Sequence, residues 1–355
     1  MKVTVVGGGN IGTLMGAEMA YKGHEVTMYT SKPEKWNDEI EVLDDTSKVL
    51  LTGKLAHVTS DLEYAVKDAA IIWVVLPAEL FLDFGKKLAL YIKSGQMVGV
   101  VPGSGGAEFA LHDVIEKGGI LFGFQRVHSI ARLEEYGKSV RMLGRKSKLE
   151  LGSIPAKESG RISRLVSEMF NMPCTALPNY LCVTLTPSNQ ILHTARLYAM
   201  FKDYQQEMVY PKNFLFYEEW TQLSSEILFD CDEELQKLCK AIPLELSDVM
   251  SLKKYYESPT TEAMTRKISG IKAFKGLVAP MIKRANGWVP DLNSRYFSTD
   301  FPYGLKVIKE LAVAFDVKTP TIDTIWNWYV KFDNKRAEKA FKLTEVRKNL
   351  VEMYQ

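Results

Sequence analysis

Short apolar runs alternate with helical patterns along the first half of the chain. Residues 2–6 form a β-branched run suited to a buried strand, and an alanine- and methionine-rich helical pattern follows a glycine turn. The same order recurs downstream, with apolar runs at 24–29, 71–76 and 97–101 and helical patterns at 61–69 and 79–92. Strands that alternate with helices predict a doubly wound parallel sheet. The runs lack polar alternation, which indicates strands covered on both faces.

The pattern changes near residue 183. Long amphipathic helical patterns then dominate, at 188–208, 214–241, 260–284, 302–314 and 320–331. Thr186 and Pro187 fit a helix start, with an N-cap followed by proline at the first helical position. The sequence therefore predicts the α/β class: an N-terminal Rossmann domain with a doubly wound parallel sheet over residues 1–182, followed by an all-α C-terminal domain over residues 183–355.

The glycine turn after the first strand has the spacing G-x-G-x-x-G. In a dinucleotide site the first glycine permits the tight turn, the second lets the backbone approach a pyrophosphate, and the third lets the helix pack against the strand. The helix N-terminus then presents free N–H groups to the phosphates. Because the turn lies between a strand and a helix, we expect it to bind a dinucleotide cofactor through Gly7, Gly9, Asn10, Ile11 and Gly12.

The residues after the second strand bear on the choice of cofactor. An NAD-specific site usually has Asp or Glu at this strand end, whereas small polar and basic groups receive a 2′-phosphate. This chain has Thr30, Ser31 and Lys32 there, which favours NADP(H), with NAD(H) still possible; the alternative is that Lys32 is an ordinary solvated loop residue. Leu76 and Pro77, at the end of a later strand, are expected beside the nicotinamide half of the cofactor.

Composition narrows the class of protein. The 355 residues carry a net charge of +2, so nucleic acid is not an implied partner. The four cysteines lack CxxC spacing, and we expect reduced, mostly buried thiols and no metal site. The N-terminus is a core strand rather than a signal peptide, and no apolar run reaches the ~20 residues of a membrane helix. These features predict a cytoplasmic protein that does not bind membranes.

Two stretches of the second half hold residues suited to catalysis. Asn189 and His193 lie four apart on one helical pattern and so share a face, and a histidine can donate or accept a proton near neutral pH. Further on, the turn-rich stretch 287–305 contains Arg295 and Asp300, which could bind a substrate carboxylate and a histidine respectively. The alternatives are a structural histidine, a surface arginine and a helix-capping aspartate.

Taken together, the glycine turn and three later segments resemble the octopine/nopaline (opine) dehydrogenases. The segments are 186–193, 216–219 and 295–305, of which the last, with the sequence RYFSTDFPYGL, is the most specific. The resemblance implies a Rossmann domain and a helical domain with the active site in the cleft between them. It also implies that the enzyme joins an amino acid to an α-keto acid, often pyruvate, and reduces the imine with NAD(P)H.

The resemblance assigns roles to individual residues. The catalytic histidine of the family falls on His193, its aspartate partner on Asp300 and its carboxylate-binding arginine on Arg295. Asn189 would orient the substrate or the nicotinamide amide, and Tyr217 and Glu218 are weaker candidates for binding the amine. The partners are thus small molecules, whose identity sequence spacing does not give, and a symmetric homodimer is the default expectation.

Two other functions stay open at this stage. The first is an NADP-dependent keto or hydroxy acid oxidoreductase like the ketopantoate reductases, which depend on a lysine in the helical domain; no lysine shares the face of Asn189 and His193. The second is a non-catalytic NADP-sensing protein, which would need no acid–base residue. The combination of His193, Arg295 and Asp300 favours the opine dehydrogenase over both.

Overall fold

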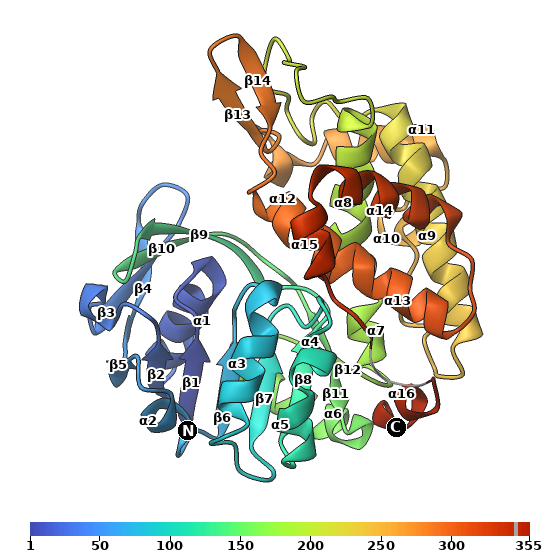
Figure 1. Ribbon diagram of the computed structural model, residues 1–355. Helices are drawn as coiled ribbons and strands as arrows, with labels where there is room; N and C mark the ends of the chain where they lie inside the picture. The colour runs from blue at the N-terminus through green and yellow to red at the C-terminus, as the bar shows by residue number, and fades with distance from the viewer. Residues whose placement is uncertain (344–346) are drawn as a thin grey trace. The chain divides into compact units, whose positions relative to one another are not determined.

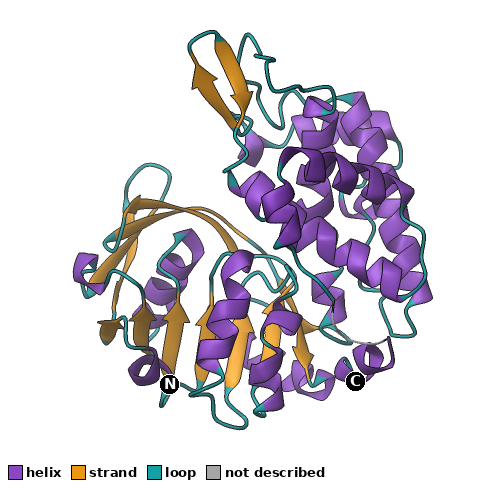
Figure 2. Ribbon diagram, in the orientation of Figure 1, coloured by secondary structure: helices purple, strands orange, loops and turns teal. Residues whose placement is uncertain are grey.

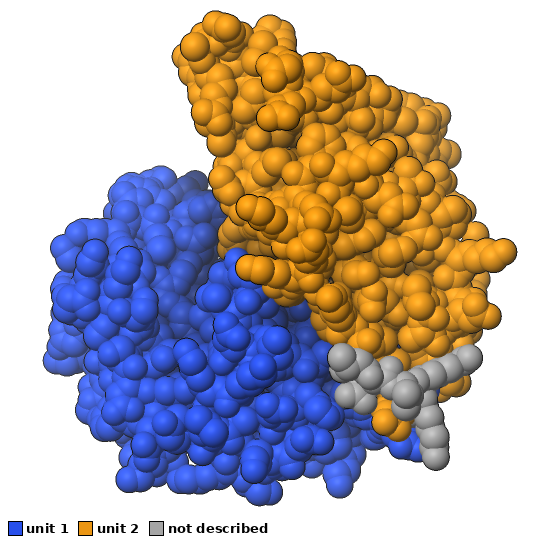
Figure 3. All heavy atoms as spheres, in the orientation of Figure 1, with its two compact units in different colours: residues 1–184, 351–355 blue, residues 185–350 orange. Residues whose placement is uncertain are grey.

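The computed structural model describes residues 1–343 and 347–355. The chain divides into two compact units, residues 1–184 with 351–355 and residues 185–350 (Figure 1, Figure 3). The domain boundary placed after residue 182 stays a prediction, and the C-terminal residues 351–355 group with the first unit. Within the described residues, no helix is both long and apolar enough to cross a membrane.

The first unit is built on an eight-stranded sheet with the order β12-β11-β8-β7-β6-β1-β2-β5. Six neighbouring strands, from β5 to β8, are parallel, while β11 runs antiparallel to β8. The strand order reverses beside β1, which is the switch point at which doubly wound sheets bind ligands. The predicted doubly wound sheet is confirmed, with strands β1 Lys2–Val6, β2 Glu25–Tyr29, β5 His57–Thr59, β6 Ile71–Val74, β7 Met97–Val100, β8 Ile120–Phe124, β11 Leu149–Ile154 and β12 Cys174–Ala176.

Helices cover both faces of this sheet. α1 and α6 contact each other, and α3, α4 and α5 form a second group, of which α3 and α5 lie in front of the sheet in Figure 1. Trp73 is fully buried, and the rings of Phe122, Phe124 and Phe170 meet it edge-on at 5.1–5.7 Å. The helices are α1 Asn10–Tyr21, α2 Leu62–Val66, α3 Phe81–Leu88, α4 Ala107–Ala110, α5 His112–Glu116, α6 Ser159–Phe170 and α7 Leu181–Thr184.

A second, four-stranded sheet packs against α1. It has the order β4-β3-β10-β9, with β3 Glu39–Leu43, β4 Val49–Lys54, β9 Ser129–Glu135 and β10 Ser139–Arg145. Glu18 of α1 anchors it, because its carboxylate pairs with His128 at 2.9 Å and with Arg145. Burial raises the pKa of Glu18, but His128 and Arg145 outweigh burial and lower it overall. Sequence patterning predicts a strand at 140–144, within β10, but did not predict a separate second sheet.

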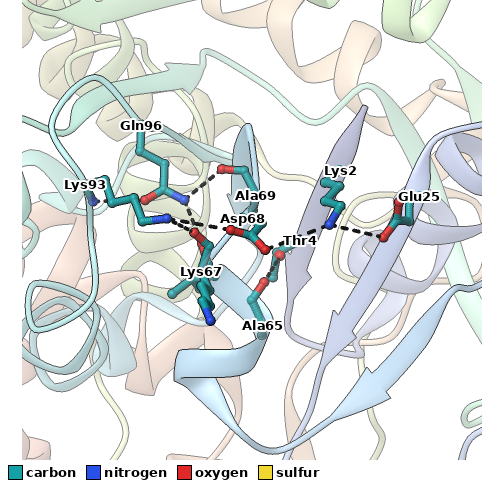
Figure 4. Close-up of polar contacts among 10 residues, drawn as sticks. Lys2, Thr4, Glu25, Ala65, Lys67, Asp68, Ala69, Lys93 and Gln96 are labelled. Atoms are coloured by element: carbon teal, nitrogen blue, oxygen red, sulfur yellow. Dashed lines mark hydrogen bonds and ion pairs between the residues drawn. The ribbon is translucent and has the colours of Figure 1, made fainter.

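The amino ends of the parallel strands carry a separate polar cluster (Figure 4). Lys2 pairs with Glu25 and Asp68 at 3.9 Å, and Lys93 pairs with Asp68 at 3.7 Å. The amide nitrogen of Gln96 donates to the carbonyl oxygens of Val66 and Ala69, each at 2.7 Å. The charged side chains are half exposed, so each ion pair contributes about 0–1 kcal/mol. This edge is structural, and the opposite edge carries the glycine turn.

The second unit is mainly helical (Figure 2). Its longest helix, α9, contacts α8, α11 and α14. The predicted helical C-terminal domain is confirmed, and it contains one element that the sequence did not predict. Met281–Arg284 and Gly287–Pro290 pair as the antiparallel hairpin β13–β14. The helices are α8 Asn189–Phe201, α9 Gln222–Ala241, α10 Leu252–Tyr255, α11 Thr261–Ser269, α12 Arg295–Ser298, α13 Lys306–Ala314, α14 Pro320–Phe332 and α15 Asn334–Glu338; α16 Arg347–Met353 follows.

Two buried carboxylates of α9 hold other helices in place. Glu234 accepts hydrogen bonds from the backbone N–H groups of Thr321 and Ile322, at 2.7 and 3.0 Å, in the first turn of α14. Asp232 accepts one from the N–H of Leu252 at 2.8 Å, at the start of α10. Burial raises the pKa of Asp232 to about 6. Both satisfy N–H groups that have no partner within their own helices.

Candidate active site

Helix α8 carries His193 and Asn189 on the same face. Asn189 is the first residue of the helix and is exposed, whereas His193, one turn later, is only 6% exposed. The helix begins where Pro187 and Ser188 end the preceding turn, close to the predicted start, but it stops at Phe201 rather than Met208. It therefore presents one exposed amide and one shielded imidazole.

Asp300 lies beside His193. Its Oδ2 is 2.8 Å from Nδ1 of the imidazole, so the pairing expected from the sequence is present. Asp300 is the N-cap of a π-helical turn, Phe301–Leu305, that contacts α8. A Cβ at Gly304 would lie 2.8 Å from Cβ of Gln190, so glycine is required there for the turn to approach α8 this closely.

Tyr217 is hydrogen-bonded to the other ring nitrogen of His193. Its hydroxyl oxygen is 2.8 Å from Nε2 of His193, whereas the sequence analysis predicted that Tyr217 binds the amine. An ionised carboxylate only accepts hydrogen bonds, so Nδ1 carries the proton that faces Asp300. Nε2 of the neutral ring then accepts from the Tyr217 O–H. Asp300, His193 and Tyr217 thus form a continuous hydrogen-bonded line.

Aromatic rings fix the plane of the imidazole. Tyr296 lies over His193 with ring centres 4.5 Å apart and an angle of 30°, and Phe216 meets it edge-on at 5.5 Å. The ring of Tyr217, whose hydroxyl contacts Nε2 of His193, stacks on the ring of Phe274 with centres 4.1 Å apart. His193 is therefore held in one orientation by packing as well as by hydrogen bonds.

Arg196 fixes the loop that carries Tyr217. This buried side chain, one turn after His193 on α8, donates to the carbonyl oxygens of Phe216 at 3.0 Å and Glu219 at 2.6 Å, on either side of Tyr217. Burial lowers its pKa to about 10. Sequence analysis did not identify this role, because periodicity shows only that Arg196 lies near the face of His193.

The remaining substrate candidates are less tightly held. Arg295, the first residue of α12, is exposed, and its guanidinium makes no hydrogen bond or ion pair with any residue the structure describes. Glu218 accepts a hydrogen bond from the N–H of Gly276 at 2.6 Å and so anchors a loop. Among the described residues, neither side chain forms a hydrogen bond or ion pair with His193, whose polar partners are Asp300 and Tyr217.

The glycine turn of the first unit fits a dinucleotide. Gly7 has φ +105°, and a Cβ at Gly12 would lie 1.9 Å from the carbonyl oxygen of Gly7, so both positions require glycine. A Cβ at Gly9 would meet no protein atom within 4 Å, which leaves room for a pyrophosphate. Oδ1 of Asn10 accepts from the N–H of Leu133 at 2.9 Å, so Asn10 and Ile11 offer mainly backbone N–H groups to a phosphate.

The end of β2 lies next to this turn, since the N–H of Gly7 donates to the carbonyl oxygen of Tyr29 at 3.1 Å. Ser31 and Lys32 are exposed, whereas Thr30 is buried and its hydroxyl is 2.8 Å from that of Tyr136. Leu76 packs against Gly7, and Pro77 begins the next short helical turn.

Sequence reasoning missed Trp36 beside the glycine turn. Its ring would lie 2.3 Å from a Cβ at Gly8, so Gly8 is needed for the indole to pack against the turn. The extra glycine between Gly7 and Gly9 was the only sequence signal for this contact. Of the cysteines, Cys174 is half-buried and the other three are buried, and no disulfide joins any two of them. No group of three or more potential ligands suited to a metal ion occurs within residues 1–343 and 347–355.

Two family models match the chain. Residues 176–332 match the NAD/NADP octopine/nopaline dehydrogenase alpha-helical domain. Residues 2–116 match the N-terminal part of NAD-dependent glycerol-3-phosphate dehydrogenase. The first match covers the segment that carries His193, Tyr217, Arg295 and Asp300, and the second covers the glycine turn.

Several opine dehydrogenases are similar to the chain over nearly its whole length. An octopine dehydrogenase of Pecten maximus is 27% identical over 92% of this chain and 89% of its own. A tauropine dehydrogenase of Arabella iricolor is 28% identical over 96% of this chain and 94% of its own. An opine dehydrogenase of an Arthrobacter species is 26% identical over 90% of this chain and 88% of its own.

Solved structures share the fold. An octopine dehydrogenase with NADH and L-arginine has a TM-score of 0.84 at 24% identity, covering 94% of this chain and 90% of its own. A 2-dehydropantoate 2-reductase of Geobacter metallireducens has a TM-score of 0.66 at 12% identity, covering 94% of this chain and 100% of its own, and is a more distant neighbour. With the family match and the relatives, these findings show that residues 176–332 form a helical domain of the octopine/nopaline dehydrogenase type. They also show that the chain is similar over nearly its whole length to the opine dehydrogenases, which are NAD(P)-dependent oxidoreductases that act on CH–NH groups.

Proposed function

We propose that this enzyme joins the amino group of an amino acid to an α-keto acid, with pyruvate the first candidate, and reduces the resulting imine with NADPH to a secondary amine dicarboxylate. The line Asp300–His193–Tyr217 is the observation that supports it most, because it is a shielded acid–base arrangement within the family's helical domain. Relatives crystallised with L-arginine or with pyruvate and NADH support the substrate classes.

His193 holds and returns the proton in this reaction. Asp300 keeps the Nδ1 proton in place and stabilises the positive charge when the ring is protonated, as an opposite charge in contact does. Removing water from the carbinolamine requires a proton at the leaving oxygen, and the reverse reaction returns it. The nicotinamide cofactor, when bound, supplies the hydride.

Arg295 and Asn189 are proposed to position the substrate. Both are exposed, and an arginine fork matches a carboxylate through two parallel hydrogen bonds. Holding the reacting carbon in place in this way lowers the activation free energy by several kcal/mol, on the order of the gain seen in well-oriented intramolecular reactions. Tyr217 and Glu218 were the candidates for the amine, and of these only Tyr217 contacts His193.

The cofactor preference is proposed to be NADP(H). Ser31 and Lys32 follow β2 where an NAD-specific site usually has an acidic residue, and both are exposed. We expect Lys32→Ala to weaken NADPH binding by roughly tenfold, the loss of one charge-assisted contact of about 1–2 kcal/mol, and to leave NADH binding unchanged. Fluorescence titration with both cofactors measures this, with Lys35→Ala as the control. Equal loss for both cofactors would contradict the assignment.

Mass spectrometry of the product tests the reaction. NADPH, pyruvate and each amino acid in turn should yield a secondary amine whose mass is the sum of the two substrates, minus water, plus two hydrogens. Formation of lactate in place of that product would show a simple keto-acid reductase. A symmetric homodimer stays a prediction, which light scattering tests.

A further inference from the structure

Both ring nitrogens of His193 are engaged within the helical unit. Nδ1 is 2.8 Å from Oδ2 of Asp300, and Nε2 is 2.8 Å from the hydroxyl oxygen of Tyr217. An imidazole nitrogen makes one in-plane hydrogen bond, so a substrate oxygen can reach His193 only by displacing a partner. A phenol hydroxyl has one donor and two acceptor positions, so it can bind His193 and a substrate oxygen at the same time.

We propose that Tyr217 is a further catalytic residue, an inference that rests on the proposed function. Its hydroxyl carries the proton between Nε2 of His193 and the substrate oxygen. His193 then never touches that oxygen, and Asp300, His193 and Tyr217 act as a three-membered relay. The alternative is that the substrate displaces Tyr217 and meets His193 directly.

Packing favours the relay over displacement. The imidazole is held between Tyr296, with ring centres 4.5 Å apart, and Phe216, edge-on at 5.5 Å. The Tyr217 ring is stacked on Phe274 at 4.1 Å and an angle of 20°, and the side chain is 6% exposed. Moving Tyr217 off His193 would break this stacking, whereas the relay needs no side-chain movement.

The backbone of Tyr217 is fixed as well. Arg196 donates to the carbonyl oxygens of Phe216 and Glu219, which bracket Tyr217. The indole of Trp220 lies parallel to the Tyr217 ring at 6.4 Å. Because α8 carries both Arg196 and His193, the helix that places the imidazole also places the loop that brings the hydroxyl to it.

The step balances without any other reactant. The ammonium group of the incoming amine gives a proton to the Tyr217 oxygen while the Tyr217 proton moves to Nε2, which charges His193. The amine adds to the carbonyl carbon, and a proton then moves from its nitrogen to the new alkoxide oxygen, which gives the neutral carbinolamine. The C–O bond of the carbinolamine then breaks, its electron pair stays on the oxygen, and that oxygen takes the Tyr217 proton and leaves as water. The Tyr217 oxygen takes the proton from Nε2, and the amine lone pair forms the C=N bond. Nothing is oxidised or reduced in this step.

Tyr217→Phe tests the relay, because it removes the hydroxyl and keeps the ring on Phe274. We expect kcat to fall by roughly 10²–10³-fold, within the range of a lost acid–base group, while KM for the keto acid changes less than about threefold. Tyr198→Phe is the matched control, since it removes a hydroxyl from a tyrosine of α8 whose ring packs against Trp328 and not against His193. That control should keep the wild-type kcat.

The opposite result overturns the relay. If the substrate displaces Tyr217, Tyr217→Phe removes a competitor for Nε2, and kcat stays at or above the wild-type value. A second measurement needs no variant: kcat of the wild-type enzyme in mixtures of H2O and D2O should follow a curve when two protons move together, and a straight line contradicts the relay. Wild-type enzyme that does not oxidise NADPH with any amine and keto acid would instead refute the proposed function.

Discussion

Nδ1 of His193 lies 2.8 Å from Oδ2 of Asp300, although the two residues are 107 positions apart in the chain. The imidazole is 8% exposed and the carboxylate 18%. A carboxylate at this distance stabilises the protonated ring, and water competes little for either partner. The pair can therefore hold a proton ready for transfer. The group that is hydrogen-bonded to Nε2 of His193 determines where that proton goes.

Removing either member of this pair should slow turnover without affecting the cofactor. We expect His193→Ala to lower kcat by roughly 10²–10⁴-fold, the range for loss of an acid–base group, and Asp300→Asn to lower it by a similar factor. Because the two act as a unit, the double variant should lose little more than either single variant. Steady-state kinetics measure this, and NADPH titration should give wild-type affinity. Full turnover in His193→Ala would remove it from the mechanism.

Two glycines of the cofactor turn should respond differently to alanine. A Cβ at Gly9 meets no protein atom within 4 Å, so Gly9→Ala should fold normally and bind NADPH at least tenfold more weakly, about 1.4 kcal/mol. A Cβ at Gly12 would lie 1.9 Å from the Gly7 carbonyl oxygen, so Gly12→Ala should lower the thermal midpoint of unfolding. Calorimetry and cofactor titration separate the two effects. Unchanged NADPH affinity in Gly9→Ala would contradict the pyrophosphate site.

Arg196→Met should lower both stability and turnover. The change leaves the buried carbonyl oxygen of Phe216 without its donor, which costs about 1–3 kcal/mol in free energy of unfolding, and the part-buried carbonyl oxygen of Glu219 loses the same donor at a smaller cost. Tyr217 should also lose its fixed position, so kcat should fall. Arg266→Met, on the exposed surface of α11, serves as the control. Urea unfolding and kinetics on both variants check this; wild-type kcat in Arg196→Met would show that the loop does not depend on the arginine.

The Rossmann half was readable from sequence because each of its features is local. The β-branched run, the glycine spacing and the following helix lie within twenty-one residues, and the buried strands β6 and β7 coincide with two apolar runs. The second sheet was missed because strands such as Val49–Lys54 are mostly exposed and lack a clear alternation. Of the hairpin, β13 was read as the end of the helical pattern 260–284 and β14 as part of the turn-rich stretch 287–305, since each strand is only four residues long.

The site was only partly readable for a similar reason. His193 and Asp300 lie in segments that resemble the opine dehydrogenases, so the resemblance could pair them before the structure was known. The position of Tyr217 depends on the course of a loop between Phe214 and Thr221 that the helical pattern hid, and Arg196 fixes that loop through backbone carbonyls. Every residue carries a backbone carbonyl group, so a hydrogen bond to one does not require a particular side chain. The sequence pattern therefore cannot reveal it.

Glu108 should make the stability of the first unit depend on pH. It is fully buried, accepts from the hydroxyls of Thr184 at 2.5 Å and Tyr354 at 2.8 Å, and burial raises its pKa to about 7. The unfolded chain releases this proton near the ordinary pKa of glutamate, below that of the folded protein. Stability should therefore be full below about pH 4.5 and fall by roughly 3 kcal/mol as pH rises through 7.

Glu108→Gln isolates that effect, because glutamine is neutral at every pH and keeps an acceptor oxygen. Relative to the wild type, the variant should gain roughly 3 kcal/mol in free energy of unfolding between about pH 4 and about pH 8. Urea unfolding of both proteins across this range measures the difference. A constant difference across the range would show that Glu108 titrates at its ordinary value.

NADPH oxidation with pyruvate, with each amino acid, and with both together tests the central claim most directly. An enzyme that reduces an imine needs both substrates, so we expect oxidation only when amine and keto acid are present, with His193→Ala as the inactive control. NADPH oxidation by pyruvate alone at the same rate would contradict the account, since His193, Asp300 and Tyr217 would then serve an ordinary keto-acid reductase.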